Sequence, residues 1–113
     1  MPNDNCVLTF QKLDVYIAAK DMARLVNGAR INHTELRDQA QRASISCFLQ
    51  LAEGLPNRGQ GMRRKYFTES NNSLHEVVAA VDLACTLGAL STETGQAIQA
   101  LGLRLQQMLR ALL

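Results

Sequence analysis

A repeat of small and apolar residues between positions 67 and 88 constrains the fold of this chain more than any other feature. Its members follow one another at alternating steps of three and four residues: Phe67, Ser70, Leu74, Val77, Val81, Ala84 and Gly88. Such steps keep one stripe of an α-helix turned toward its neighbours, as in left-handed helical bundles. The segment 62–87 is therefore predicted to be a helix that packs lengthwise against others and ends at the glycine.

Two helices before this segment are predicted from residues that begin or end helices. Thr9 is a candidate N-cap for the first helix, and Gly28 is a candidate glycine just after its end. Asn32, with Glu35 three residues on, matches a capping box at the start of the second helix. The sequence Gly54-Leu55-Pro56-Asn57 ends that helix, because glycine and proline both interrupt a helix.

A fourth helix follows Ser91 or Thr92, either of which can cap it. Its apolar residues again repeat at steps of three and four: Ile98, Leu101, Leu105, Met108 and Leu112. Gly95 and Gly102 lie inside this helix, where they can permit a close approach to another helix or simply weaken the end of the helix. The predicted helices cover about residues 9–27, 33–54, 62–87 and 92–112. With no strand-like alternation, residues 1–113 predict one all-α domain, an antiparallel up-down four-helix bundle.

The second predicted helix has more apolar surface than one bundle core requires. One stripe consists of Leu36, Ala40, Ala43, Cys47 and Leu51, and a second of Ile45, Phe48, Ala52 and Leu55, about 100° away around the helix. The second stripe can complete a thick core or contact another subunit. We predict a homo-oligomer with Ile45, Phe48 and Leu55 at its interface.

No catalytic or metal-binding group of residues is recognisable. His33 and His75 lie in different predicted helices, and neither has a His or Cys three or four residues away. Cys47 and His75 could form a nucleophilic pair, but a thiol within an apolar stripe is usually inert. The glycines at 54, 59 and 61 lack the lysine and the preceding strand of a phosphate-binding loop. We predict a protein that is not an enzyme and that holds no cofactor or metal.

The cysteines and the apolar runs bear on the location of the protein. Cys6, Cys47 and Cys85 are odd in number and scattered, as expected of reduced thiols that act as small apolar side chains. No apolar run approaches the roughly 20 residues that span a bilayer, and no secretory signal is apparent at the N-terminus. We expect a cytoplasmic protein that does not contact a membrane.

Polar residues form a row along the second predicted helix, and a shorter row follows on the third. The members are Gln39, Arg42, Ser46, Gln50 and Glu53 on the second helix, with Ser70, Ser73 and Glu76 on the third. Such rows can form a polar network across the two helices, or an ordinary solvated face. Arg42 could make bidentate bonds to Glu53 or Glu76 of its own or a neighbouring subunit. A contact with a small ligand or a nucleic acid is the functional alternative.

Basic residues gather in the middle of the chain although the net charge is only +2. Residues 37–65 contain six basic and two acidic side chains, and the loop–helix junction there carries Arg58, Arg63, Arg64 and Lys65, with Tyr66 beside them. Such side chains suit phosphate contacts, and the tyrosine ring could stack on an unpaired base. Alternatively this is a solvated face, stabilised by pairs such as Lys65–Glu69.

Three motifs of the chain resemble a known family. Gln39-Ala40-Gln41-Arg42-Ala43-Ser44-Ile45-Ser46, Leu51-Ala52-Glu53-Gly54 and Ser73-Leu74-His75-Glu76 are similar to segments of the four-helix-bundle proteins of the ribosomal-RNA intervening-sequence family. The likeness extends from about Phe10 to Leu109. Three positions depart from the family pattern: Phe48 and Gln50 stand where the family has Pro and Asn, and Asn72 replaces a Gly.

The resemblance implies a non-enzymatic bundle that assembles as a ring-like homopentamer. It also implies a relation to the accessory proteins of diversity-generating retroelements, which bind a reverse transcriptase and nucleic acid. On this basis we expect an adaptor that binds RNA or DNA, and a reverse transcriptase as a partner. The expected contacts are Arg42, Arg58, Arg63, Arg64, Lys65 and Tyr66. The alternative is a protein–protein scaffold or small regulatory partner protein, held by the apolar face of the second helix without nucleic-acid binding.

Overall fold

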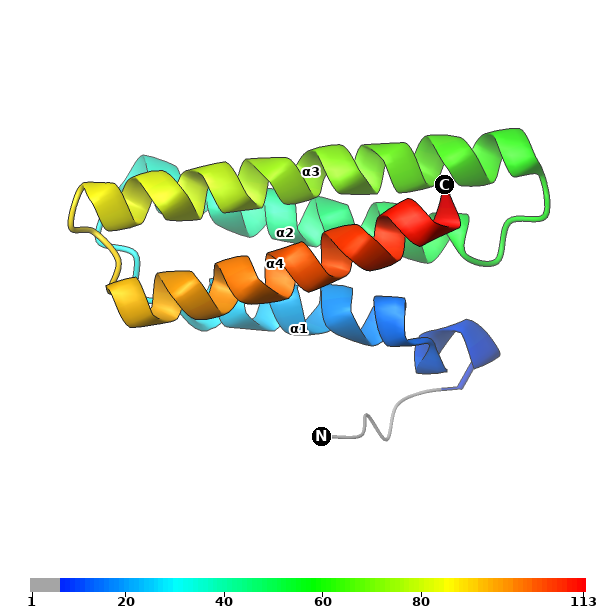
Figure 1. Ribbon diagram of the computed structural model, residues 1–113, viewed down its shortest axis with the longest axis horizontal. Coiled ribbons are helices and arrows are strands. Elements are labelled where there is room, and N and C mark those ends of the chain that lie inside the picture. The colour runs from blue at the N-terminus through cyan, green and yellow to red at the C-terminus, as the bar shows by residue number, and fades with distance from the viewer. Residues whose placement is uncertain (1–6) are drawn as a thin grey trace.

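The computed structural model describes residues 7–113 and is built from helices alone in that range (Figure 1). A short 3-10 helix, η1 (Thr9–Lys12), precedes α1 (Asp14–Gly28), α2 (Thr34–Gly54), α3 (Gln60–Thr86) and α4 (Thr92–Leu112). The prediction of a four-helix, all-α fold is confirmed. Cys6, which we expected to be a reduced thiol, lies outside the described residues.

The four α-helices lie lengthwise beside one another and measure 44 × 30 × 21 Å as a whole (Figure 1). Short connections at alternate ends link successive helices, and each helix packs against the next one along the chain. Helix α4 also packs against α1, which closes the bundle, and the contact between α2 and α3 is the most extensive. No helix in the described part of the chain is long and apolar enough to cross a membrane.

The predicted stripe of α3 faces the core. All its members from Phe67 to Ala84 are buried, whereas Gly88 is exposed and adopts a positive φ of 72° just after the helix. Glycine takes up this left-handed conformation without the steric cost that other residues incur. Helix α3 begins at Gln60, two residues before the predicted start, so the connection from α2 is shorter than expected.

The first predicted helix, 9–27, is interrupted at Leu13, whose ψ of 141° is extended. Residues Thr9–Lys12 form the separate η1, so Thr9 does not cap α1. The side-chain oxygen of Gln11 accepts hydrogen bonds from the backbone N–H groups of Val7 and Leu8, which favours a tight turn here. Gly28 is the last residue of α1 rather than a left-handed glycine after it, because the chain continues extended at Ala29.

The predicted capping box at Asn32 and Glu35 is wrong, because His33 caps α2. Its Nδ1 atom accepts a hydrogen bond from the backbone N–H of Leu36 at 3.2 Å. The backbone N–H of Asn32 instead donates to the carbonyl oxygen of Ala89 at 2.8 Å. This bond joins the α1–α2 connection to the α3–α4 connection at the same end of the bundle.

Small residues let α2 and α3 approach closely. The predicted core stripe of α2 is buried at Ala40, Ala43, Cys47 and Leu51. The Ser70 hydroxyl donates to the carbonyl oxygen of Cys47 at 2.7 Å, so a buried polar group of α3 is satisfied by the backbone of α2.

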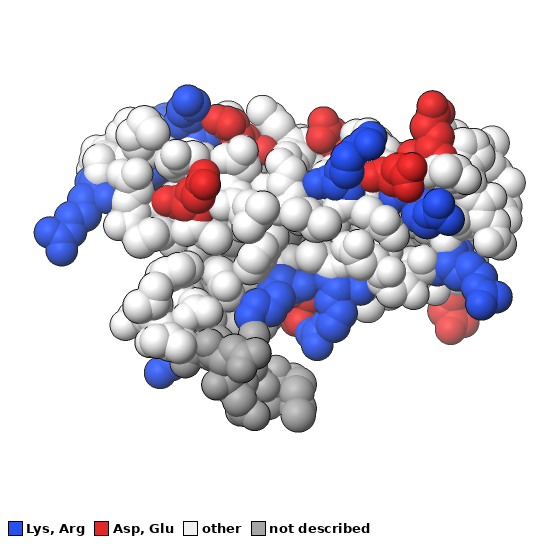
Figure 2. All heavy atoms as spheres, turned by 180° about the vertical axis from the view of Figure 1, so that it is seen from behind, with Lys and Arg blue, Asp and Glu red and all other residues white. Residues whose placement is uncertain are grey.

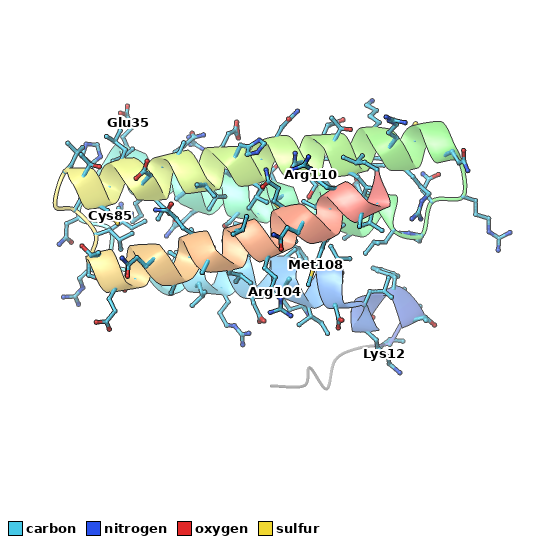
Figure 3. The ribbon with its side chains drawn as sticks, in the orientation of Figure 1. Lys12, Glu35, Cys85, Arg104, Met108 and Arg110 are labelled. Carbon is cyan, nitrogen blue, oxygen red and sulfur yellow. The ribbon has the colours of Figure 1, made fainter. Side chains whose placement is uncertain are left out.

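The glycines of α4 lie at close contacts, as the sequence suggested. A Cβ atom on Gly95 would overlap Cys85 Sγ, which lies near the end of α3 (Figure 3). A Cβ atom on Gly102 would lie 3.1 Å from Val78 Cγ2 and 3.4 Å from Met22 Cε. A side chain at position 95 would therefore require the Cys85 side chain to move, and one at position 102 would require Val78 to give by a few tenths of an ångström.

Candidate functional site

The end of the bundle at the α2–α3 connection carries exposed basic side chains. Arg58 lies in the connection, and Arg64 and Lys65 lie in the first two turns of α3; all three are exposed. None of the three forms an ion pair within residues 7–113, and the alternative pair Lys65–Glu69 is not formed. These three cations are therefore available to an external anion.

The N-terminus of α3 lies at the same end and is open. Gly59 is its N-cap and provides no side-chain hydrogen bond, and the first turn contains no acidic residue. The free N–H groups and the helix dipole make such a terminus electropositive. Beside it lies a hollow of about 450 Å³, lined by Gln60, Gly61, Arg63, Arg64, Leu112 and Leu113. The sequence pattern did not indicate this contribution, because the predicted helix began at Met62 and left Gln60 and Gly61 in the loop.

Arg63 differs from its basic neighbours, because its side chain turns back onto α2. Its Nη1 atom donates to the carbonyl oxygen of Leu55 at 2.6 Å and to those of Gly54 and Asn57 at 3.3 Å each. The guanidinium carbon lies 5.0 Å from the centre of the Phe67 ring. Carbonyl groups at a helix C-terminus lack partners within the helix, so Arg63 supplies donors that the end of α2 needs. This arginine joins α2 to α3, and its Nη1 atom is engaged by the end of α2.

Replacing Arg63 by methionine is expected to lower the free energy of unfolding by about 2 kcal/mol, because charge-assisted hydrogen bonds and a cation–π contact are lost. Urea denaturation followed by circular dichroism measures the change. Arg64→Met is the matched control, since Arg64 is exposed and makes no such bonds; we expect its effect to stay within about 0.5 kcal/mol. Equal effects of the two substitutions would contradict the capping role.

The other predicted contacts lie in different surroundings. Tyr66 is half-buried, and its Cβ atom lies next to Gly54 of α2. Arg42 is exposed on α2, where its Nη2 atom donates to Gln39 Oε1 at 3.4 Å. The structure thus brings Arg58, Arg64 and Lys65 together at one end and places Arg42 elsewhere.

The polar rows of α2 and α3 meet at one hydrogen bond, from the Ser73 hydroxyl to the Ser46 hydroxyl at 3.1 Å. Glu53 and Glu76 are exposed, and Arg42 pairs with neither. The Oε1 atom of Gln50 is buried without a hydrogen-bond partner. Part of the row lines a hollow of about 410 Å³ on α2, formed by Arg42, Ile45, Ser46, Leu49, Gln50 and Glu53.

The second apolar stripe of α2 is only partly accessible. The Phe48 ring is half-buried and packs on the Tyr16 ring of α1 at a centroid distance of 5.0 Å, and Leu55 is 9% exposed. Ile45 is 46% exposed, and Leu49, which the sequence analysis did not select, is 53% exposed. Of the predicted interface residues, only Ile45 presents a largely free side chain.

Cys47 and His75 do not form a nucleophilic pair. Cys47 is fully buried against Ser70 on α3, and burial raises the pKa of its thiol, an effect that the Ser70 hydrogen bond partly offsets. A thiol with a raised pKa carries little of the reactive thiolate. His75 is exposed, and its Nε2 atom lies 3.0 Å from Gln106 Nε2 of α4. Residues 7–113 contain no group of three or more His, Cys, Asp or Glu side chains arranged to hold a metal ion.

Charges of both signs are interspersed over the face of the molecule shown in Figure 2. Lys and Arg side chains lie beside Asp and Glu there, without a broad area of one sign. On this face, any polyanion site of a single copy is therefore local. The mixture of charges on this face agrees with the small net charge of +2. The exposed basic residues at the α2–α3 end of the bundle are the candidate site for a polyanion.

Comparison with known proteins gives one family match and no curated relative. The model of the family described as 23S rRNA-intervening sequence protein matches residues 11–111. No curated protein matches the chain significantly. Because the family match spans nearly the whole chain, and the fold is the expected all-helical bundle, this chain belongs to the 23S rRNA-intervening sequence protein family.

Proposed function

We propose that the protein is a non-enzymatic, oligomeric adaptor that binds nucleic acid through the basic end of the bundle. The observation that carries this proposal is the exposure of Arg58, Arg64 and Lys65, without ion pairs in the described residues, beside the open N-terminus of α3. Cationic side chains and free backbone N–H groups are the two kinds of donor that proteins use on phosphates.

The chemistry of this end favours contacts with the nucleic-acid backbone over reading of base sequence. Arginine and lysine side chains neutralise phosphates and release condensed counterions, so affinity should fall steeply with salt. The predicted stacking aromatic, Tyr66, is half-buried, which limits its contact with a base. The family name refers to 23S rRNA, which makes RNA the first ligand to test.

The proposal is tested by the binding of labelled RNA and DNA oligonucleotides, measured by fluorescence anisotropy over a series of salt concentrations. We expect the double variant R58E/R64E to lose at least about tenfold in affinity at low salt. The slope of log affinity against log salt should also fall by about one unit or more. Arg63 is left unchanged, because its replacement would disturb the end of α2.

The matched control is R30E/R104E, which changes the net charge by the same amount. Both arginines are exposed, and Arg30 lies in the α1–α2 connection. Arg104 lies on α4 (Figure 3). We expect the control to retain most of the affinity. Absence of RNA and DNA binding by the wild-type protein at low salt, or equal losses in the two double variants, would contradict the proposal.

Assembly is the second part of the proposal. We infer that up-down bundles associate as a homo-oligomer, for which the family resemblance suggests a ring-like homopentamer. Association would repeat each basic end several times and strengthen the field that a polyanion meets. A reverse transcriptase is the protein partner that the same resemblance suggests. A light-scattering mass equal to that of the monomer would contradict the homo-oligomer.

A protein–protein scaffold without nucleic-acid binding is the second candidate function. It is favoured by an exposed apolar hollow between α3 and α4, lined by Leu74, His75, Val78, Gln99, Gly102, Leu103 and Gln106. Leu103, which borders it, is 57% exposed. Capture of a protein partner from native cells that is lost in Leu103→Asp, with no RNA recovered, would favour this function over the first.

A further inference from the structure

Helices α3 and α4 lie side by side and border two hollows, one at the basic end and one farther along the bundle (Figure 1). The hollow at the basic end is lined by Arg64 of α3 and by Leu112 and Leu113 at the C-terminal end of α4. The other, of about 320 Å³, lies between the middle of α3 and the middle of α4, and we call it the α3–α4 hollow. Both hollows therefore follow the same pair of helices.

One row of side chains on each helix connects the two hollows. On α3 the row begins at the basic end and proceeds at steps of four and three residues: Arg64, Thr68, Asn71, His75 and Val78. On α4 it approaches the same end at steps of four, three and four residues: Gln99, Leu103, Gln106 and Arg110. Such steps keep side chains on one side of a helix. We call these two rows the α3–α4 track.

The charge of the α3–α4 track suits a polyanion. Neither row contains an acidic residue, and each has an arginine toward the basic end, Arg64 on α3 and Arg110 on α4 (Figure 3). Arg110 is exposed and, like Arg64, forms no ion pair within residues 7–113. From Arg64 to Val78 the track is about 21 Å long, at 1.5 Å per residue. Because successive nucleotides of a stacked strand are about 3.4 Å apart, several nucleotides fit along it.

The α3–α4 hollow, at the far end of the track, combines an apolar lining with amide groups. Leu74, Val78 and Leu103 supply apolar side chains, of which Leu103 is 57% exposed. Apolar side chains can cover the face of a base that has left its stack. The amides of Gln99 and Gln106 border the same hollow.

These amides favour a base over an apolar side chain of a partner protein. Gln106 Nε2 lies 3.0 Å from His75 Nε2, whereas the Gln106 amide oxygen and the amide of Gln99 form no hydrogen bond within residues 7–113. An amide presents a donor and an acceptor together, as the edge of a base does. A purely apolar contact would cover these groups and leave them unpaired, which is unfavourable.

We propose that the α3–α4 hollow holds an unpaired base of a single-stranded RNA whose phosphates are bound at the basic end. The inference rests on the nucleic-acid binding of the proposed function and adds the place where a base is held. The strand follows the α3–α4 track, with Arg64 and Arg110 on its phosphates. Leu103 covers one face of the base, and the amides of Gln99 and Gln106 bond to its edge.

Two substitutions remove parts of this site and leave the basic end unchanged. Gln106→Ala removes an amide, and Leu103→Ala removes most of an exposed apolar side chain. We expect each to lower the affinity for single-stranded RNA by at least about fivefold, as for the loss of one base contact. Because no phosphate contact is lost, the slope of log affinity against log salt should not change. Affinity for the same RNA in a duplex should also not change, since its bases are paired and stacked.

The measurement is fluorescence anisotropy with one labelled RNA oligonucleotide, as a single strand and annealed to its complement, over a series of salt concentrations. We expect the wild type to bind the single strand more tightly, whereas contacts with phosphates alone would favour the more densely charged duplex. Gln107→Ala is the matched control, because Gln107 is exposed on α4 and does not line the hollow. Circular dichroism checks that each variant keeps its helices, as expected because alanine favours a helix.

The base site would be overturned if Q106A and L103A bind the single strand as Q107A does, or if they change the salt slope as R58E/R64E does. Loss of a protein partner in L103A, with RNA affinity unchanged, would assign the hollow to the protein–protein scaffold instead. Equal binding of single strand and duplex, both dependent on Arg58 and Arg64, would overturn the base site and leave the proposed function in place. Absence of RNA and DNA binding by the wild type would overturn both.

Discussion

Replacing Phe67 by alanine is expected to lower the free energy of unfolding by about 3–5 kcal/mol. Its ring is fully buried at the interface of α2 and α3, where it lies under the Arg63 guanidinium and beside Gly54. Removing it leaves a cavity among helices that cannot close fully, and it also removes the surface on which Arg63 rests. Because single domains of this size are stable by only about 5–15 kcal/mol, the loss is a large share of the total.

Urea denaturation of the F67A variant, followed by circular dichroism at 222 nm, measures this effect. Leu87→Ala is the control, since Leu87 is 57% exposed after the end of α3 and its removal leaves no cavity. We expect the control to change stability by no more than about 0.5 kcal/mol. A loss below about 1 kcal/mol in F67A would show that the α2–α3 interface does not depend on this ring.

Replacing Gly54 by alanine is expected to destabilise the fold by about 3 kcal/mol, the upper end of the range for overpacked sites. A Cβ atom at this position would lie 2.7 Å from Phe67 Cε1 and 2.9 Å from Tyr66 Cβ. The ring is held in the core, and the tyrosine Cβ is fixed by the backbone of α3, so neither can move without separating the helices. The Arg63 bond to the Gly54 carbonyl would be disturbed as well.

Gly61→Ala is the matched control for this substitution. Gly61 lies in the first turns of α3, and nothing lies within 4 Å of a Cβ atom built there. Because alanine favours a helix over glycine, we expect this control to stabilise the protein by up to about 1 kcal/mol. Thermal denaturation of both variants gives the comparison. If G54A is as stable as the wild type, the close approach at the end of α2 is not required.

The long helices could be predicted from the sequence because their signals are local and redundant. The stripe from Phe67 to Ala84 repeats over several turns, and the predicted bounds of α4, 92–112, agree with the structure. Ser91 caps α4 by accepting a hydrogen bond from the Thr94 N–H at 3.2 Å. Such a cap acts within one turn of the chain, so the sequence contains all the information it requires.

The incorrect predictions concern helix starts, where more than one residue near the start could act as the N-cap. Asn32 and His33 could both begin α2, and the bond of the Asn32 N–H to Ala89 is made with a segment far along the chain. The first helix was likewise predicted to begin too early, because Thr9 is a residue type that can act as an N-cap. The extended backbone at Leu13 separates η1 from α1, which begins at Asp14, and Leu13 itself is 44% exposed.

By itself, the sequence determined that the chain forms four helices and which stripe of each is apolar, because helix formation and hydrophobic periodicity are properties of neighbouring residues. Only the tertiary structure decided which of the two adjacent arginines, Arg63 or Arg64, forms hydrogen bonds to α2. Arg63 and Arg64 are equivalent in a sequence, yet the first donates to carbonyl groups at the end of another helix and the second is exposed. That difference arises because successive residues of a helix point about 100° apart, so only one of the two faces α2.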